Sequence, residues 1–230
     1  AFLYGGYTML CKSRTLSIVW KAVIFASATM GILLQCGVFS GKPDYSVLNY
    51  YTLMSNILCA VYYLPAALWA SRKKGGTLLP QVKGTLVMCI IVTGMVYQFF
   101  LAGRFEMQGT LLVSNVLLHY VVPWMTVLDW ILFDKKGYFK RYSPFLWVIA
   151  PVAYFIYVNI RVAGGAILGP YGDKYPYYFM DYDKLGVAPV IFINLGMAVF
   201  FVLLGYGIVG IDHFLAKREK KKELKEAKGK

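Results

Sequence analysis

Six long apolar stretches restrict the fold of this chain more than any other feature of its sequence. They span roughly 16–39, 47–69, 84–103, 110–133, 144–162 and 187–211. A helix needs about 20 apolar residues to cross the ~30 Å hydrocarbon layer of a bilayer. The runs are continuous rather than alternating, which does not fit the strands of a membrane barrel. The sequence therefore predicts an all-α, polytopic membrane protein with six transmembrane helices.

The composition agrees with this assignment and narrows the possible partners. Hydrophobic residues make up 59% of the 230 residues and charged residues 15%, whereas soluble domains carry roughly 25% charge. A net charge of +13 raises the question of nucleic-acid binding. The basic residues lie in short clusters between the apolar runs, however, and this distribution is typical of membrane topology. We therefore expect no nucleic-acid partner.

The distribution of Lys and Arg among the connections predicts the orientation of the helices. Most of the 24 basic residues precede helix 1, separate helices 2 and 3, separate helices 4 and 5, or follow helix 6. They are Lys12, Arg14, Lys21, Arg72, Lys73, Lys74, Lys83, Lys135, Lys136, Lys140, Arg141 and the basic residues from Lys217 to Lys230. The other connections hold Lys42, Arg104, Arg161, Lys174 and Lys184. Because basic connections stay inside, both termini are predicted in the cytoplasm, at the plasma membrane or, in a bacterium, the inner membrane.

These boundaries give a cytoplasmic N-terminal segment, residues 1–15, a transmembrane domain, residues 16–211, and a basic cytoplasmic tail, residues 212–230. No charged leader with a short apolar stretch and a small-residue cleavage site appears at the start, so we expect no removed signal peptide. The tail is expected to extend helix 6 into water as a solvated topology anchor. The same residues can also contact anionic lipid head groups, at about 1 kcal/mol per basic residue.

The connection between helices 5 and 6 is unusually long. It is rich in glycine up to Gly172 and then aromatic, with Tyr-Pro-Tyr-Tyr-Phe-Met-Asp over residues 175–181. Loops of this length are uncommon unless they have a function, and no phosphate-binding motif accompanies the glycines. We predict a lid or re-entrant cap over the outer side.

Polar side chains within the spans share one depth, counted at 1.5 Å per residue. The outer halves of the six helices hold Gln35, Thr52, Asn56, Gln98, Asn115, His119, Asn159, Arg161 and Asn194. Such groups are costly in lipid unless they meet partners or water, so their common depth predicts a cavity among the outer helix ends. Taken singly, Gln35, Gln98 and Asn194 fit interhelical hydrogen bonds of ~0.6 kcal/mol each. The inner half holds mainly Thr126 and Asp129.

Two helices carry the strongest candidate site. One face of helix 2 has i, i+3, i+4, i+7 spacing of small polar residues, namely Thr52, Ser55, Asn56 and Cys59. On helix 4, Asn115 precedes His119 by one turn, and Pro123 removes the backbone hydrogen bond to the carbonyl of His119. His119 is the one histidine inside a span, so it is either functional or a structural hydrogen-bonding residue between helices.

These residues resemble one family of membrane proteins over roughly residues 15–212. Thr52-Leu-Met-Ser-Asn56, the pair Asn115-x-x-x-His119 with its following proline, and the Tyr-Pro-Tyr segment leading to Asp181 are similar to the androgen-induced-protein-like family, which includes the androgen-dependent TFPI-regulating protein. The spacing around the threonine and after the histidine matches the bacterial branch better than the animal one. Animal members are intramembrane hydrolases of fatty-acid esters of hydroxy fatty acids that use a threonine and a histidine. The resemblance implies these two roles for Thr52 and His119.

The chemistry of the residues is compatible with ester hydrolysis. A threonine hydroxyl needs a neighbouring base to act as a nucleophile, and His119 is expected at nearly the depth of Thr52 on another helix. Asn56 or Asn115 are candidate oxyanion donors, and Ser55 and Arg161 are candidate supporting residues.

No carboxylate on helix 4 can orient the histidine ring. Asp129 is about 15 Å along the axis from His119, so Asp181 or Asp183 in the outer loop are the candidates. Soluble-hydrolase and metalloprotease motifs are absent. The four widely spaced cysteines, Cys11, Cys36, Cys59 and Cys89, form no CxxC unit, so we expect no metal and no cofactor.

Two functions remain open. The first is a threonine/histidine intramembrane hydrolase acting on a lipid ester substrate within the membrane, and the alternative is a non-catalytic lipid or small-molecule binding or transport protein using the same cavity. Transport is less favoured, because the two halves show no inverted repeat and no paired broken helices. Neither the acyl-chain length nor the oligomeric state follows from the sequence.

The predicted orientation can be tested by cysteine accessibility. A cysteine placed at position 73, in the connection between helices 2 and 3, is expected to resist an impermeant reagent applied outside intact cells. Labelling of that position from outside would contradict the orientation.

Overall fold

The computed structural model describes residues 9–72, 77–103 and 107–228. Residues 1–8 of the expected N-terminal segment, Lys73, Lys74 and Arg104 lie outside the described residues. The longer helices are α1 (Arg14–Gln35), α2 (Tyr51–Ala70), α3 (Pro80–Val96), α4 (Gly109–Val116), α5 (Val122–Phe133), α6 (Ser143–Trp147), α7 (Ile149–Ala163) and α9 (Val187–Lys228). Short 3-10 helices are η1 (Val38–Ser40), η2 (Ser46–Asn49), η5 (Pro170–Gly172) and η6 (Tyr178–Met180), and α8 is Tyr182–Leu185.

The all-helical prediction is confirmed for the described residues, which contain no strand. Among them, six helices are long and apolar enough to cross a membrane: Arg14–Gln35, Tyr51–Ala70, Pro80–Leu101, Gly109–Phe133, Ser143–Ala163 and Val187–Lys222. The first helix ends earlier than expected because Gly37 adopts a left-handed φ of 65°. The last runs through the expected boundary at residue 212 without a break, as a helix of about 63 Å.

Prolines and π-helical turns interrupt the spans. Pro123 cannot donate a hydrogen bond to the carbonyl of His119, and a π-helical segment, η4 (Leu117–Val121), joins α4 to α5. Pro151 likewise cannot donate to the carbonyl of Trp147, the residue at which α6 ends before α7 begins. A second π-helical segment, η3 (Tyr97–Leu101), completes the span that α3 begins.

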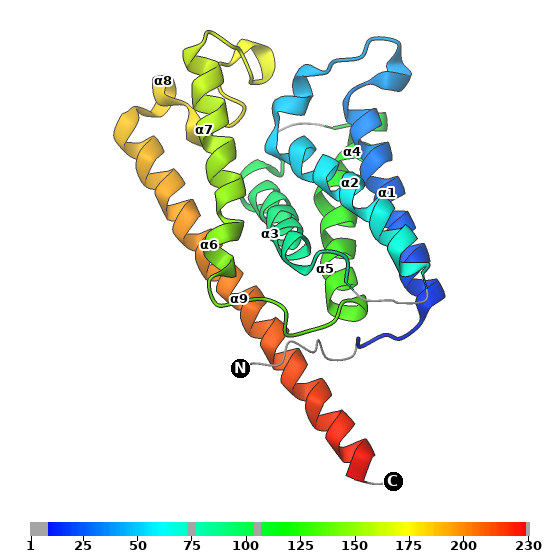
Figure 1. The fold of residues 1–230 in the computed structure, drawn as a ribbon. Helices are drawn as coiled ribbons and strands as arrows, with labels where there is room; N and C mark the ends of the chain where they lie inside the picture. The colour runs from blue at the N-terminus through cyan, green and yellow to red at the C-terminus, as the bar shows by residue number, and fades with distance from the viewer. Residues whose placement is uncertain (1–8, 73–76, 104–106, 229–230) are drawn as a thin grey trace.

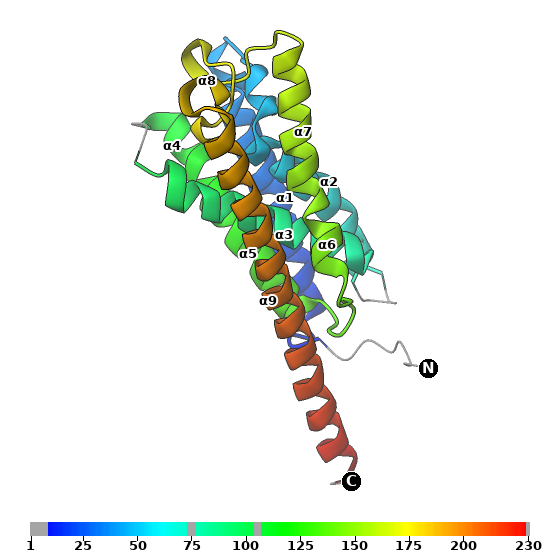
Figure 2. The ribbon, with the colours of Figure 1, turned by 90° about the vertical axis from the view of Figure 1, so that its left-hand side faces the viewer.

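The helices pack as a four-span group with two further spans against one side. Helices α1, α2, α3 and the α4–α5 span contact one another, while α6 and α9 pack together and against α3 (Figure 1). Figure 2 shows α9 projecting far beyond the other helices at the C-terminal end. We call that end of the bundle the tail end, and the opposite end, which carries residues 36–50 and 164–186, the cap end.

A buried ionic cluster ties three spans together toward the tail end. The two carboxylate oxygens of Asp129 on α5 accept hydrogen bonds from Lys21 on α1, at 2.6 Å, and Lys83 on α3, at 2.5 Å. The Tyr63 hydroxyl on α2 lies 3.3 Å from the same carboxylate. A buried charge must be paired and hydrogen-bonded to be tolerated, and Asp129 is paired with two lysines. The cluster therefore fixes the relative positions of α1, α3 and α5.

Three of the lysines assigned to the basic flanks are therefore not solvated. Lys21 and Lys83 pair with Asp129 inside the bundle, and the buried Lys136 ammonium donates to the Trp130 carbonyl. Position near the end of a span does not distinguish a solvated lysine from one that turns inward to a buried acid.

Replacing Asp129 with asparagine should strongly destabilise the fold. The substitution leaves two buried ammonium groups without their shared carboxylate, and breaking a buried ion pair in this way costs about 3–5 kcal/mol. The matched control is Asp183→Asn, which removes an exposed pair with Lys174 and should cost less than about 1 kcal/mol. Thermal unfolding of the detergent-solubilised variants measures both, and equal losses would contradict a structural role for the cluster.

Candidate functional site

Thr52 and His119 meet near the cap end of the bundle, as expected from their depth. Thr52 lies in the first turn of α2 and His119 in the π-helical segment η4. The Thr52 hydroxyl oxygen is 3.2 Å from Nε2 of His119. This is hydrogen-bond distance, so the structure brings together the two residues that the sequence singles out most strongly.

The second ring nitrogen fixes the direction of that hydrogen bond. Nδ1 of His119 is 3.1 Å from the backbone carbonyl of Asn115, one turn earlier. A carbonyl oxygen only accepts, so in this contact Nδ1 carries the hydrogen, and in the neutral imidazole Nε2 is then the acceptor. The Thr52 hydroxyl therefore donates to His119, which is the arrangement in which histidine can remove the threonine proton.

Tyr97 completes the surroundings of the histidine, and sequence reasoning missed it. Its ring stacks on that of His119 with centroids 3.9 Å apart and planes inclined by 27°. Its hydroxyl accepts a 2.7 Å hydrogen bond from the side-chain amide of Asn115. Tyr97 begins one π-helical segment and His119 lies in the other, so the two irregular turns meet at this ring pair. Single π turns inside helices are frequent at functional sites.

The side chains of Asn56 and Ser55 are engaged in hydrogen bonds within the bundle. The Asn56 amide donates to the carbonyls of Thr52, at 2.8 Å, and Leu118, at 3.2 Å, which ties α2 to the η4 segment. Ser55 contacts the Thr93 hydroxyl on α3 at 2.7 Å. All four residues of the predicted α2 face are buried. Because both amide hydrogens of Asn56 are used, it positions the site and does not serve as an oxyanion donor.

The outer-loop acids and Arg161 are engaged elsewhere. Asp181 caps α8 by accepting from the backbone amides of Asp183 and Lys184. Asp183 pairs with Lys174 at 2.6 Å, and the exposed Arg161 donates to the Tyr157 hydroxyl at 2.8 Å. The expectation that Asp181 or Asp183 orients the histidine ring is therefore corrected: the Asn115 carbonyl has that position, because it lies one turn away on the same helix.

A cavity of about 270 Å³ lies beside Thr52. Its walls come from α2, from α3 and η3, from Val148 and α7, from α9, and from the segment 177–180. Most of the lining side chains are aliphatic or aromatic, and Thr52, Thr93 and Asn194 supply the small polar ones. His119, Asn115 and Asn56 are not among the lining residues, so the expected polar cavity is instead an apolar one that the threonine reaches and the histidine supports from behind.

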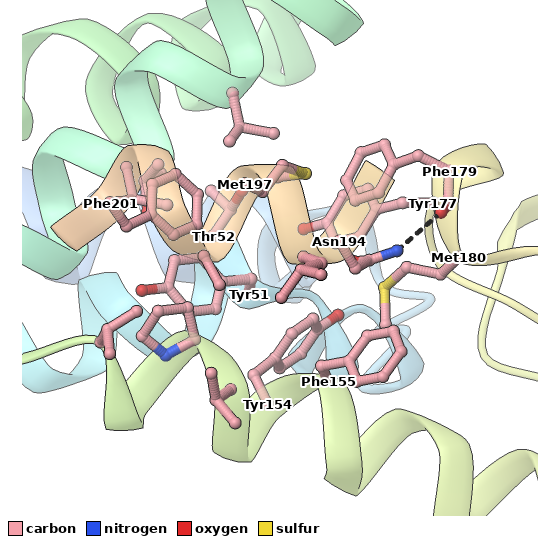
Figure 3. Close-up of a pocket in the computed structure, with 18 of the residues that line it drawn as sticks. Tyr51, Thr52, Tyr154, Phe155, Tyr177, Phe179, Met180, Asn194, Met197 and Phe201 are labelled. Atoms are coloured by element: carbon pink, nitrogen blue, oxygen red, sulfur yellow. Dashed lines mark hydrogen bonds between the residues drawn. The ribbon is translucent and has the colours of Figure 1, made fainter. Parts of the chain in front are cut away.

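Residues 164–186, which we call the cap, close this cavity at the cap end. Tyr177, Phe179 and Met180 are buried against α7 and α9, and the Tyr177 and Phe179 rings stack at 5.2 Å. Asn194 on α9 donates to the Phe179 carbonyl at 3.0 Å, the bond drawn in Figure 3. The predicted covering by the connection between the last two spans is therefore present at the cap end.

Tyr177 brings a hydroxyl from the cap to the cavity that Thr52 also lines. Its ring lies against that of Tyr154, with centroids 6.3 Å apart. Burial raises the pKa of Tyr177, so this hydroxyl stays protonated at neutral pH and remains a hydrogen-bond donor.

Other polar residues of the predicted set act between helices. Ser114 on α4 donates to Gln35 on α1 at 2.9 Å, and Tyr120 donates to Gln98 at 2.9 Å. The interhelical interpretation is confirmed for both glutamines. The residues that the structure describes hold no group of three or more His, Cys, Asp and Glu side chains able to bind a metal ion.

The fold and the site together describe a helical protein with six membrane-length apolar spans and a partly buried Thr–His pair beside an apolar cavity. Comparisons with protein-family models, with curated proteins and with solved structures found no match. The functional argument therefore depends on the chemistry of the site itself.

Substituting Tyr97 with phenylalanine should reveal how the histidine is supported. The variant keeps the stacked ring but leaves the buried Asn115 amide without its acceptor, which costs about 1–3 kcal/mol. Tyr120→Phe, which removes a more exposed hydroxyl from the neighbouring helix, is the matched control and should cost less. Thermal unfolding compares the two, and a Tyr97→Phe protein as stable as wild type would show that the Asn115 contact contributes nothing.

Proposed function

We propose that this chain is an intramembrane hydrolase of lipid esters, with Thr52 as nucleophile and His119 as general base. The observation that carries the proposal is the hydrogen bond from the Thr52 hydroxyl to Nε2 of His119, with Nδ1 held by the Asn115 carbonyl. Nucleophile, base and orienting group within hydrogen-bond reach are what covalent catalysis by a hydroxyl requires. The position of Thr52 on the wall of an apolar cavity supports a lipid substrate.

The reaction follows from these positions. Nε2 of His119 takes the hydroxyl proton as the Thr52 oxygen attacks the ester carbonyl carbon, and the carbonyl oxygen becomes an oxyanion. The intermediate collapses with loss of the alcohol, which receives the proton from His119, and leaves an acyl group on Thr52. A water molecule, deprotonated by His119, then attacks this acyl group and releases the fatty acid and the free threonine.

Tyr177 is the donor that we assign to the oxyanion. Asn56 has no free amide hydrogen, whereas the neutral Tyr177 phenol lines the same cavity as Thr52. A preorganised donor of this kind stabilises charge that develops only in the transition state. The cap therefore has a chemical role in the proposal besides covering the cavity.

The orientation and the family resemblance complete the proposal. The clustering of Lys and Arg favours the tail end in the cytoplasm and the cap end outside. In that orientation the basic end of α9, which projects beyond the bundle, lies where anionic lipid head groups are available. The resemblance to the androgen-induced-protein-like family, carried by Thr52 and His119, supports the same chemistry.

The alternative is a lipid or small-molecule binder or transporter that uses the same cavity without chemistry. It is favoured by the location of His119 behind the cavity wall. The two functions differ in what they require of Thr52: hydrolysis needs its hydroxyl, whereas binding in an apolar cavity does not.

Thr52→Ala and His119→Ala should each abolish hydrolysis of a lipid ester and covalent labelling by a fluorophosphonate probe. Losses of similar size are expected because nucleophile and base act as a unit. Tyr177→Phe should lower turnover by about 10²–10³ if its phenol carries the oxyanion. Thr126→Ala, which removes another buried threonine hydroxyl from the neighbouring α5, is the matched control and should keep full activity.

Peptide mapping of the probe adduct identifies the nucleophile directly, with thermal unfolding as the check on folding. An adduct on any residue other than Thr52 would refute its assignment. A wild-type protein that binds lipid but hydrolyses no ester, with binding unaffected by Thr52→Ala, would establish the alternative function.

A further inference from the structure

The wall of the cavity is thick on one side and thin on another. Toward α3 its wall consists of deeply buried side chains such as Val92 and Thr93. Toward α7 and α9 the lining residues are themselves on the surface: Val152 is 40% exposed, Ile191 50% and Leu195 58%. A side chain that lines a cavity and also faces outward forms a wall one residue thick. The cavity therefore approaches the surface between α7 and α9.

The packing of the two helices explains this thin wall. Toward the tail end α9 packs tightly on α6, where a Cβ added to Gly205 would lie 2.8 Å from Pro144. Toward the cap end α7 and α9 separate, as both ribbon views show. The helices thus form a V whose open part coincides with the cavity, and we call this opening the α7–α9 seam.

The seam lies within the length of the apolar span Val187–Lys222 rather than at its first residue. Ile191 and Leu195 are about 6 and 12 Å along α9 from its first residue, Val187. The outward neighbours on both helices are apolar and exposed, among them Ile156 on α7 and Phe192 on α9. At the cap end the buried side chains of Phe179 and Met180 cover the cavity. An apolar ligand from the bilayer meets no such barrier.

We propose that a lipid acyl chain enters the cavity sideways from the bilayer through the α7–α9 seam and lies against Thr52. We choose an acyl chain as the occupant because the lining is apolar and the opening faces hydrocarbon. A polar solute would have to leave water to reach this opening. That the acyl chain belongs to an ester rests on the proposed function. Binding of the acyl chain itself needs no catalysis. The seam thus defines the orientation of the substrate: chain first, between α7 and α9, with its polar end toward Thr52 and the cap.

The test is photo-cross-linking in phosphatidylcholine vesicles that contain the full-length protein and a fatty acid with a diazirine near the middle of its acyl chain. Cross-links are expected on α7 and α9 side chains of the seam. Leu195→Trp, which fills the opening, should lower the labelling about tenfold, equivalent to about 1.4 kcal/mol, and Leu195→Ala should not lower it. Leu203→Trp is the matched control, because Leu203 is a 63% exposed leucine on the same helix that does not line the cavity.

The outcomes separate this inference from the proposed hydrolysis. Labelling that persists in Leu195→Trp, or that falls equally in Leu203→Trp, would overturn lateral entry through the seam. Labelling that is lost only in Leu195→Trp supports it, and the same pattern is expected in a Thr52→Ala background. If the chain labels the seam but the wild-type protein hydrolyses no ester, the hydrolase proposal fails and the seam stands. If Leu195→Trp hydrolyses esters at the wild-type rate, the seam fails and the hydrolase proposal stands.

Discussion

A polar group inside this bundle is costly unless it finds a partner within the protein, because the apolar surroundings of its helices offer none. The two ends meet this requirement differently. Toward the tail end, Asp129 pairs with two lysines from other helices in a closed cluster. Toward the cap end, the bonds run in a directed series from the Thr52 hydroxyl through the imidazole of His119 to the Asn115 carbonyl. A closed cluster is suited to holding helices together, and a directed series is suited to moving a proton.

Departures from regular helix create that series. In an unbroken α-helix the carbonyls are bonded along the axis, and a side chain at the His119 position has a fixed direction. Pro123 and the η4 segment alter the register of one span, and the η3 segment does so in its neighbour. A Cβ at Gly94 would come within 3.3 Å of the His119 carbonyl, so glycine allows α3 to approach this irregular turn closely. The irregular turns place Tyr97 and His119 face to face.

The cap, the cavity and the Thr–His pair form one functional unit in our proposal. The cap contributes Tyr177 to the wall of the cavity that Thr52 also lines and buries Phe179 and Met180 over that cavity, while Asn194 hydrogen-bonds the cap to α9. The cap covers the cavity at one end and leaves the α7–α9 seam as the side open to lipid. In this proposal the acyl chain of the substrate is recognised on one side of Thr52, in the cavity. The ester is cleaved on the other side, where Thr52 meets His119.

The sequence by itself determined the six apolar helices, because length and hydropathy are properties of contiguous segments. Periodicity also placed Thr52, Ser55, Asn56 and Cys59 on one buried face, and Pro123 marked the irregular turn around His119. Which helix that face meets depends on contacts between residues far apart in the chain, so Tyr97, the Asn56 bond to Leu118 and the burial of Lys21 and Lys83 could not be predicted. The tertiary structure alone decided these points, and with them the position of the seam. The sequence pattern of a helix shows which of its faces is buried, but not which other helix packs against that face.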